Sequence, residues 1–136
     1  MADNRRIVRY NGAVTDARSS LEVDDVHQAT PGAIVLAVTG ELDLATIGVL
    51  KDAVNDRLAP DVHVVLDLTG LTFCDSTGLG AFVALHRQAR ASGARFALAA
   101  PRKRIADLFA LSGIDQVIVV YDSTDSALAT PVEDGS

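Results

Sequence analysis

Residues 62–80 read VHVVLDLTGLTFCDSTGLG, and this stretch decides the fold. Its first part, residues 62–68, is a short run rich in Val and Leu between Pro60 and Gly70, which predicts a strand buried on both faces. After it, apolar side chains recur at helical spacing until Ser92 and Gly93 end the run. The stretch therefore predicts a strand of a parallel sheet that leads directly into a helix.

The junction between this strand and this helix holds an acid and two adjacent hydroxyl groups. We expect Asp75 or Ser76 to cap the helix, because their side-chain oxygens accept hydrogen bonds from free backbone N–H groups. A helix N-terminus also carries a partial positive charge that favours an anion. Relative to alanine, Gly78 and Gly80 each lower the stability of a helix by up to about 1 kcal/mol. Because they lack side chains, they leave the first turn of the helix accessible to the surface of another protein. From the junction alone, Ser76 is either a simple cap or a place for a phosphate.

The rest of the chain alternates strands and helices in the order β-β-α-β-α-β-α-β-α. This order predicts an α/β fold with a mostly parallel sheet of four to five strands and crossover helices. Within the helices, Leu44 and Leu111 are expected to face the core. The expected strands are 21–26, 33–38, 62–68, 95–100 and 116–121, and the expected helices are 44–58, 76–91, 101–112, opened by Pro101, and a short helix within 122–130, with a loop at 40–43.

Composition excludes several classes of protein. A chain of 136 residues suits one domain. Its net charge of -6 disfavours binding to a nucleic-acid backbone, and its single cysteine cannot form an internal disulfide. No run approaches the ~20 apolar residues of a membrane span, and the first residues lack the apolar stretch of a signal peptide. We therefore expect a cytoplasmic protein without a membrane or nucleic-acid partner.

Charge is distributed unevenly along the chain. Residues 1–20 hold four arginines and two aspartates, a net charge of +2, which leaves -8 for the remainder of the total of -6. This composition predicts a flexible, solvated N-terminal arm at 1–20, a globular domain at 21–130 and a disordered tail at 131–136. The four arginines are Arg5, Arg6, Arg9 and Arg18.

In sheets of this kind, functional sites lie at the carboxyl ends of the strands. Residues 40–43 (GELD) and 74–77 (CDST) both follow predicted strands. If these strands are neighbours, Asp43 and Asp75 flank the Ser76 hydroxyl. A phosphate on Ser76 would then add about -1.5 to -2 charges to an acidic surface. A docked partner would be repelled, while the helix end would stabilise the phosphate and preserve the fold.

Other chemistry finds little support in the sequence. The histidines, His27, His63 and His86, lack metal-ligand spacing, so we expect no metal. Ser76 does not lie in Gly-x-Ser-x-Gly, and neither a P-loop nor a dinucleotide-binding Gly-x-Gly-x-x-Gly is present, so we expect neither a cofactor nor an enzyme. Cys74 is expected to be a small buried apolar residue. The basic run at residues 102–104 is expected to be a solvated face.

Two motifs together resemble one known family. Gly-Glu-Leu-Asp at 40–43 and Phe-Cys-Asp-Ser-Thr-Gly-Leu-Gly at 73–80, followed by Leu108-Phe109 and Ser112-Gly113-Ile114, are similar to the STAS family, specifically the bacterial anti-sigma factor antagonists. The resemblance covers about residues 21–130. It implies a partner-switching protein whose unphosphorylated form binds an anti-sigma factor and so releases a sigma factor. A serine kinase, usually the anti-sigma factor itself, switches binding off, and a serine phosphatase restores it.

The resemblance also implies roles for individual residues. Ser76 is the phosphoacceptor, with Thr77 as the less favoured alternative, Asp75 is the preceding acid and Asp43 is the acid of the first loop. The implied docking surface adds residues of the first helical turns: Thr77, Gly78, Leu79, Gly80 and Phe82. The alternative function is a non-switching STAS module that binds a small ligand or serves as a signalling scaffold, with Ser76 as a cap.

Overall fold

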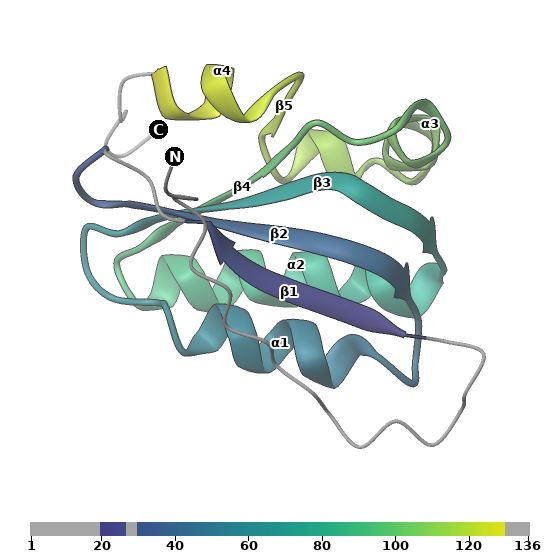
Figure 1. Ribbon diagram of the computed structural model, residues 1–136, viewed down its shortest axis with the longest axis horizontal. Coiled ribbons are helices and arrows are strands. Elements are labelled where there is room, and N and C mark those ends of the chain that lie inside the picture. Colours follow the sequence, from purple (N-terminus) through teal and green to yellow (C-terminus); the bar gives the residue numbers. More distant parts are fainter. Residues whose placement is uncertain (1–19, 27–29, 130–136) are drawn as a thin grey trace, which may run out of the picture.

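The sheet has five strands in the order β1-β2-β3-β4-β5, in which β1 is antiparallel to β2 and the other neighbours are parallel (Figure 1). The structure, a computed structural model, describes residues 20–26 and 30–129. The predicted α/β fold with a mostly parallel sheet is confirmed. The elements are β1 (Leu21–Val26), β2 (Ala33–Leu42), α1 (Ile47–Asn55), β3 (His63–Cys74), α2 (Ser76–Ala91), β4 (Arg95–Ala99), α3 (Lys103–Ser112), a 3-10 turn (Ile114–Gln116), β5 (Val120–Tyr121) and α4 (Thr124–Ala129).

Helices cover both faces of the sheet. Figure 1 shows α1 and α2 side by side below the strands and α4 above them. The main core lies between the sheet and α1, α2 and α3, and it is built from Val and Leu of the strands. Phe82 of α2 meets Phe109 of α3 edge to face, with ring centroids 5.8 Å apart. Of the described helices, none is both long and apolar enough to cross a membrane.

The two central strands are longer than their apolar runs predict. Strand β3 continues past Gly70 to Cys74, and β2 continues through Leu42, so most of the loop expected at residues 40–43 is strand. Gly70 permits this extension, because a Cβ at this position would lie 2.7 Å from Thr39 Oγ1 on β2. The pairing of β2 with β3 shifts register next to this contact. Both strands therefore reach further toward the candidate site than expected.

Two leucines that were expected in the core are exposed. Leu44 is 74% exposed because residues 43–46 form a turn and α1 begins only at Ile47, so helical spacing does not apply to it. Leu111 is 86% exposed, because it lies about 200° around α3 from the buried Phe109. Both predictions of a core position are wrong.

Three further boundaries differ from the expectation. Helix α3 begins at Lys103, two residues after Pro101, and α1 ends at Asn55. The last strand is only two residues long, because the chain between 114 and 116 forms a 3-10 turn. The predicted arm, apart from Ser20, and the predicted tail at 131–136 lie outside the described residues.

Candidate functional site

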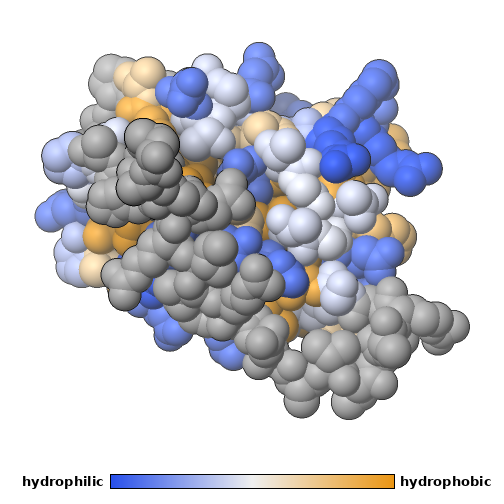
Figure 2. All heavy atoms as spheres, in the orientation of Figure 1, coloured by the Kyte–Doolittle hydropathy of each residue, from blue (hydrophilic) through white to orange (hydrophobic). Residues whose placement is uncertain are grey.

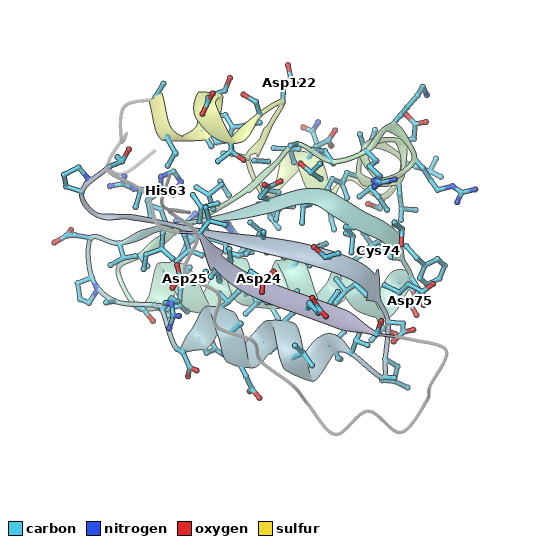
Figure 3. The ribbon with its side chains drawn as sticks, viewed as in Figure 1. Asp24, Asp25, His63, Cys74, Asp75 and Asp122 are labelled. Atoms are coloured by element: carbon cyan, nitrogen blue, oxygen red, sulfur yellow. The ribbon has the colours of Figure 1, made fainter. Side chains whose placement is uncertain are left out.

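Two acidic loops meet at the carboxyl edge of the sheet. Strands β2 and β3 are parallel neighbours, and Leu42 pairs with Cys74 at their ends. The Asp75 N–H donates a hydrogen bond to the Leu42 carbonyl (3.3 Å). Asp43 and Asp75 thus follow directly from paired residues, as expected if these strands are neighbours. Figure 3 shows Cys74 and Asp75 at this edge.

Asp75, rather than Ser76, caps helix α2. Its backbone is extended (φ -98°, ψ -174°), and its Oδ1 accepts a hydrogen bond from the Gly78 N–H at 2.9 Å. Ser76 is the first residue of the helix and is exposed. No residue in the described ranges forms a hydrogen bond with its hydroxyl group. Asp75 therefore provides the helix cap, and its neighbour Ser76 provides a free hydroxyl group.

The loop that carries Asp43 is held by Thr46, a residue that the sequence analysis did not single out. Thr46 is fully buried. Its hydroxyl accepts a hydrogen bond from the Asp43 N–H (3.0 Å) and donates one to the Glu41 carbonyl (2.8 Å). The Asp43 carboxylate accepts a further bond from the Ala45 N–H (3.0 Å). These bonds fix the position of the Asp43 side chain beside the end of β2, and a Thr three residues after an Asp is a signal that could have predicted them.

The two glycines of the first helical turns have different reasons to be glycine. Gly78 is buried, and a Cβ there would lie 2.8 Å from Cys74 Sγ and 2.9 Å from Leu42 Cγ. It is needed for packing of α2 on the strand ends. Gly80 is exposed, and a Cβ there would meet nothing within 4 Å. Only at Gly80 does the absence of a side chain leave room for another surface.

Two exposed apolar side chains lie at the same edge. Leu44 follows Asp43 and is 74% exposed, and Phe73 precedes Cys74 and is 46% exposed. Neither was predicted as a site residue, and Leu44 was expected in the core. Large exposed apolar side chains beside a polar group are typical of a surface that binds a partner.

The remaining predicted docking residues differ in exposure. Thr77 and Leu79 are half-buried, and Leu79 packs against the core. Phe82 is fully buried against Phe109. The prediction that Phe82 belongs to the docking surface is therefore wrong, because its position one and a half turns into α2 directs it toward the sheet.

Cys74 lies next to the phosphoacceptor candidate, but its thiol is inert. Burial, followed by the negative charge of Asp75, raises the pKa of Cys74 to about 12. The Sγ atom lies 3.5 Å from the Asp75 carbonyl oxygen. At neutral pH the group is a thiol and behaves as a small apolar residue, which agrees with the sequence analysis.

Neither His63 nor His86 contributes to this edge. His63 begins β3 at the opposite end of the sheet, where burial and then the charge of Arg95 lower its pKa. Burial and two arginines of α2 lower the pKa of His86. Among the described residues, no three His, Cys, Asp or Glu side chains are grouped so that they could hold a metal ion. His27 lies outside the described residues, and the absence of a metal stays a prediction.

The basic run at residues 102–104 is a solvated face, as predicted. All three side chains are exposed, and Figure 2 shows a strongly hydrophilic patch over α3. The Arg102 Nε donates a hydrogen bond to the Thr69 carbonyl (2.8 Å), and Lys103 pairs with Asp107 one turn later (2.7 Å). Arg102 and Lys103 therefore both bind groups of this same chain.

The fold and the edge described above match known proteins. The family model of the STAS domain matches residues 26–127. The chain belongs to the STAS family. Its STAS domain therefore includes every described element except most of β1 and the end of α4.

Several proteins similar to this STAS domain are named anti-sigma factor antagonists. The anti-sigma F factor antagonist of Paenibacillus polymyxa is 26% identical over 113 residues, which are 80% of this chain and 93% of the relative. The anti-sigma-B factor antagonist of Listeria monocytogenes is 30% identical over 88 residues, 64% of this chain and 77% of the relative. The crystal structure of an anti-sigma factor antagonist from Mycobacterium paratuberculosis superposes with a TM-score of 0.70 at 25% identity, covering 80% of this chain and 92% of that one.

Proposed function

We propose that this STAS domain is an anti-sigma factor antagonist and that phosphorylation of Ser76 switches its binding off. The observation that carries the proposal is the division of roles at the start of α2. Asp75 caps the helix, whereas the Ser76 hydroxyl is exposed and makes no hydrogen bond within the described part of the chain. Ser76 is therefore not needed as a cap, and its hydroxyl is accessible to a kinase. The names of the relatives support an anti-sigma factor as the partner.

The fold can tolerate a phosphate at this position. Ser76 is the first residue of a 16-residue helix, whose N-terminus carries a partial positive charge that stabilises an anion. The Ser76 hydroxyl makes no hydrogen bond within the described part of the chain, so a phosphate on it replaces none, and Asp75 can continue to cap the Gly78 N–H. We expect the melting temperature to change little on phosphorylation.

The partner would bind a surface around the serine, which we call the Ser76 surface. Leu44 and Phe73 supply exposed apolar area, and Gly80 allows close approach of the partner's backbone. Asp75 and Gly78 support this surface from within through the cap and the packing against Cys74. Its members are Asp43, Leu44, Phe73, Ser76, Thr77, Leu79 and Gly80.

Phosphorylation would weaken binding through charge. The Ser76 surface already includes the carboxylate of Asp43, and the carboxylate of Asp75 lies next to it at the adjacent strand end. A phosphate adds about -1.5 to -2 charges next to apolar side chains that binding must desolvate. We expect the free energy of binding to weaken by about 1–3 kcal/mol or more.

The proposed partners follow from this cycle. An anti-sigma factor with serine kinase activity would both bind the unphosphorylated domain and modify Ser76, and a serine phosphatase would reset it. The domain itself acts by binding and needs no catalytic activity or cofactor. Because its partners regulate transcription, we place it in the cytoplasm, without direct contact to nucleic acid.

Binding assays with Ser76 variants test the switch. We expect Ser76→Ala to bind the anti-sigma factor constitutively in the presence of ATP, and Ser76→Asp and Ser76→Glu to bind weakly. Gln88→Glu is the matched control, because it adds one negative charge to an exposed position of α2 about 18 Å further along the helix. Equal affinity of all these variants and the wild type would contradict the switch.

Mass spectrometry identifies the modified residue. After incubation with the cognate kinase and ATP, we expect a phosphopeptide that contains Ser76, and fragmentation distinguishes Ser76 from Thr77. A phosphate on Thr77 instead would identify Thr77 as the residue whose phosphorylation controls binding. If no phosphopeptide forms and the domain still binds, the non-switching module becomes the better description.

A further inference from the structure

The face of the sheet opposite α1 and α2 contains two carboxylates in one row. Leu21 and Val23 of β1 point into the core, so the intervening positions point to the opposite face. On that face Asp24 pairs with Ala37 of β2, and Ala37 pairs with Asp67 of β3. We call Asp24, Ala37 and Asp67 the back row. Its central side chain is only a methyl group and carries no charge.

Asp24 is in an unusual state for a carboxylate. It is only 7% exposed, and its Oδ1 is buried with no hydrogen-bond partner among the described residues. Its neighbour Asp25, on the core side, pairs with Arg57 at 2.8 Å. Asp67 of the back row is held by the Thr69 hydroxyl (2.6 Å). A buried carboxylate oxygen without a hydrogen-bond donor is unfavourable, so a positively charged partner would stabilise Asp24.

The described helices do not explain the burial of Asp24. Helix α4 packs on β3, β4 and β5, and α1 contacts β1 from the core side. Three parts of the chain remain as candidates to cover β1 on the back. Residues 130–136 (TPVEDGS) bring two further acids and no base, and residues 27–29 (HQA) bring one histidine. Residues 1–19 bring four arginines and a net charge of +2.

We propose that residues 1–19 dock on the back row and that one of their guanidinium groups pairs with Asp24. The opposite charges of this segment and of the rest of the chain, +2 against -8, favour this contact. Guanidinium groups are well suited to bind a carboxylate away from water. The segment then covers the edge strand β1 as well as its carboxylate. This arrangement differs from the solvated arm that composition alone favours, and it does not depend on the role of Ser76.

The chain can reach this position. Residues 1–19 join β1 at Ser20, whose carbonyl accepts a hydrogen bond from the Glu41 N–H (2.9 Å). Asp24 lies four residues further along the strand, a distance of about 13 Å. The ten residues between Arg9 and Ser20 allow their Cα atoms to lie up to about 36 Å apart. Arg5, Arg6 and Arg9 can therefore all return to Asp24 after a turn.

Limited proteolysis of the full-length protein tests the docking. Trypsin cleaves after arginine, so mass spectrometry can follow cleavage after each of the four arginines. We expect Asp24→Asn to accelerate cleavage in residues 1–19 by about tenfold, because it removes the charge that holds the segment. Asp115→Asn, which removes the same charge from an exposed position, should leave the rate at the wild-type value. Circular dichroism verifies that both variants are folded. Equal cleavage rates in wild type and Asp24→Asn would overturn the proposal.

Double-mutant cycles identify the partner of Asp24. Each arginine is replaced by glutamine with and without Asp24→Asn, and the unfolding equilibrium is measured in urea. We expect one of the four to show coupling of about fivefold or more in the equilibrium constant, and the others to be additive. Coupling with His27→Gln alone would overturn the proposal in favour of residues 27–29, and so would additivity at every arginine.

Discussion

The hydroxyl group of Thr46 accepts a hydrogen bond from the backbone N–H of Asp43 at 3.0 Å, and this contact joins the start of α1 to the end of β2. The same hydroxyl donates to the Glu41 carbonyl (2.8 Å), and Thr46 is fully buried. The acid of the first loop is therefore positioned by a polar residue in the core. This relationship and four others lead to testable predictions.

Replacing Thr46 by Val should destabilise the protein. The variant keeps the shape of the side chain but leaves the Asp43 N–H and the Glu41 carbonyl without their partner, which costs about 1–3 kcal/mol in the free energy of unfolding. Thr46→Ser keeps the hydroxyl and should recover most of the hydrogen-bonding loss. Urea denaturation measures both variants. Equal stability of Thr46→Val and wild type would show that the loop is held by other contacts.

Substitution of Asp75, but not of Ser76, should destabilise the protein, because only Asp75 caps α2. Asp75→Ala removes the acceptor of the Gly78 N–H and should lower the free energy of unfolding by about 1 kcal/mol. Asp75→Asn retains a capping oxygen and should lie close to wild type. Ser76→Ala should change stability by less than about 0.5 kcal/mol. If Ser76→Ala proved as destabilising as Asp75→Ala, the serine would have a capping role after all.

The two glycines at the start of α2 should respond oppositely to alanine. Gly78→Ala forces a methyl group against Cys74 Sγ and Leu42, and overpacking of this kind costs about 1–3 kcal/mol. Gly80→Ala meets open space and should stabilise the helix by about 0.5–1 kcal/mol. Thermal or urea denaturation gives both values. In the binding assay, Gly80→Ala should weaken the anti-sigma factor complex, and unchanged affinity would remove Gly80 from the Ser76 surface.

The exposed apolar side chains should contribute to binding rather than to folding. Leu44→Ala and Phe73→Ala remove area that water already contacts, so we expect stability changes within about 1 kcal/mol. If both contact the partner, each should weaken binding by about 1–2 kcal/mol. Isothermal titration calorimetry measures the affinity. Leu111→Ala is the matched control, because Leu111 is likewise exposed but belongs to α3, which carries no residue of the Ser76 surface, and its affinity should equal that of wild type.

Cys74 should react with thiol reagents only after unfolding. Its pKa of about 12 leaves far less thiolate at pH 8 than an unperturbed thiol has, by a factor on the order of a thousand. Burial raises the folded-state pKa above the unfolded value, so this contribution to stability is complete below the unfolded pKa of 9.0 and is lost as the pH rises toward 12. Labelling with iodoacetamide at pH 8 should be slow in the native state and fast in urea. Rapid native labelling would place the thiol at the surface.

Much of the fold follows from local patterns. The run of Val and Leu at 62–68 correctly predicts a strand buried on both faces, and the spacing after it correctly predicts the helix that begins at Ser76. The parallel order follows from the alternation of strands and helices. The ends of the elements are less predictable, because β3 is extended by a close contact between Gly70 and Thr39, two residues that are 31 positions apart.

The exposure of individual side chains within the site also depended on distant contacts. Helical spacing places Leu44 in the core, but the hydrogen bonds from Thr46 and Ile47 to the Asp43 carbonyl close a turn that leaves it outside. The family resemblance implied that Phe82 belongs to the docking surface, yet it packs against Phe109 from another helix. In each case the deciding neighbour is identified only when the chain is folded.

By itself, the amino-acid sequence determined the order of the elements, the strand-to-helix junction at Asp75 and Ser76, and the acidic character of the two loops, because these depend on backbone periodicity and on neighbours along the chain. Only the tertiary structure decided that Asp75 is the cap, that Gly78 is required for packing while Gly80 is open, and that Asp24 is buried without a partner among the described residues. The choice of Asp75 as the cap depends on where β3 ends, at Cys74. The other properties depend on close approach between strands and helices, which brings together residues that are remote in sequence.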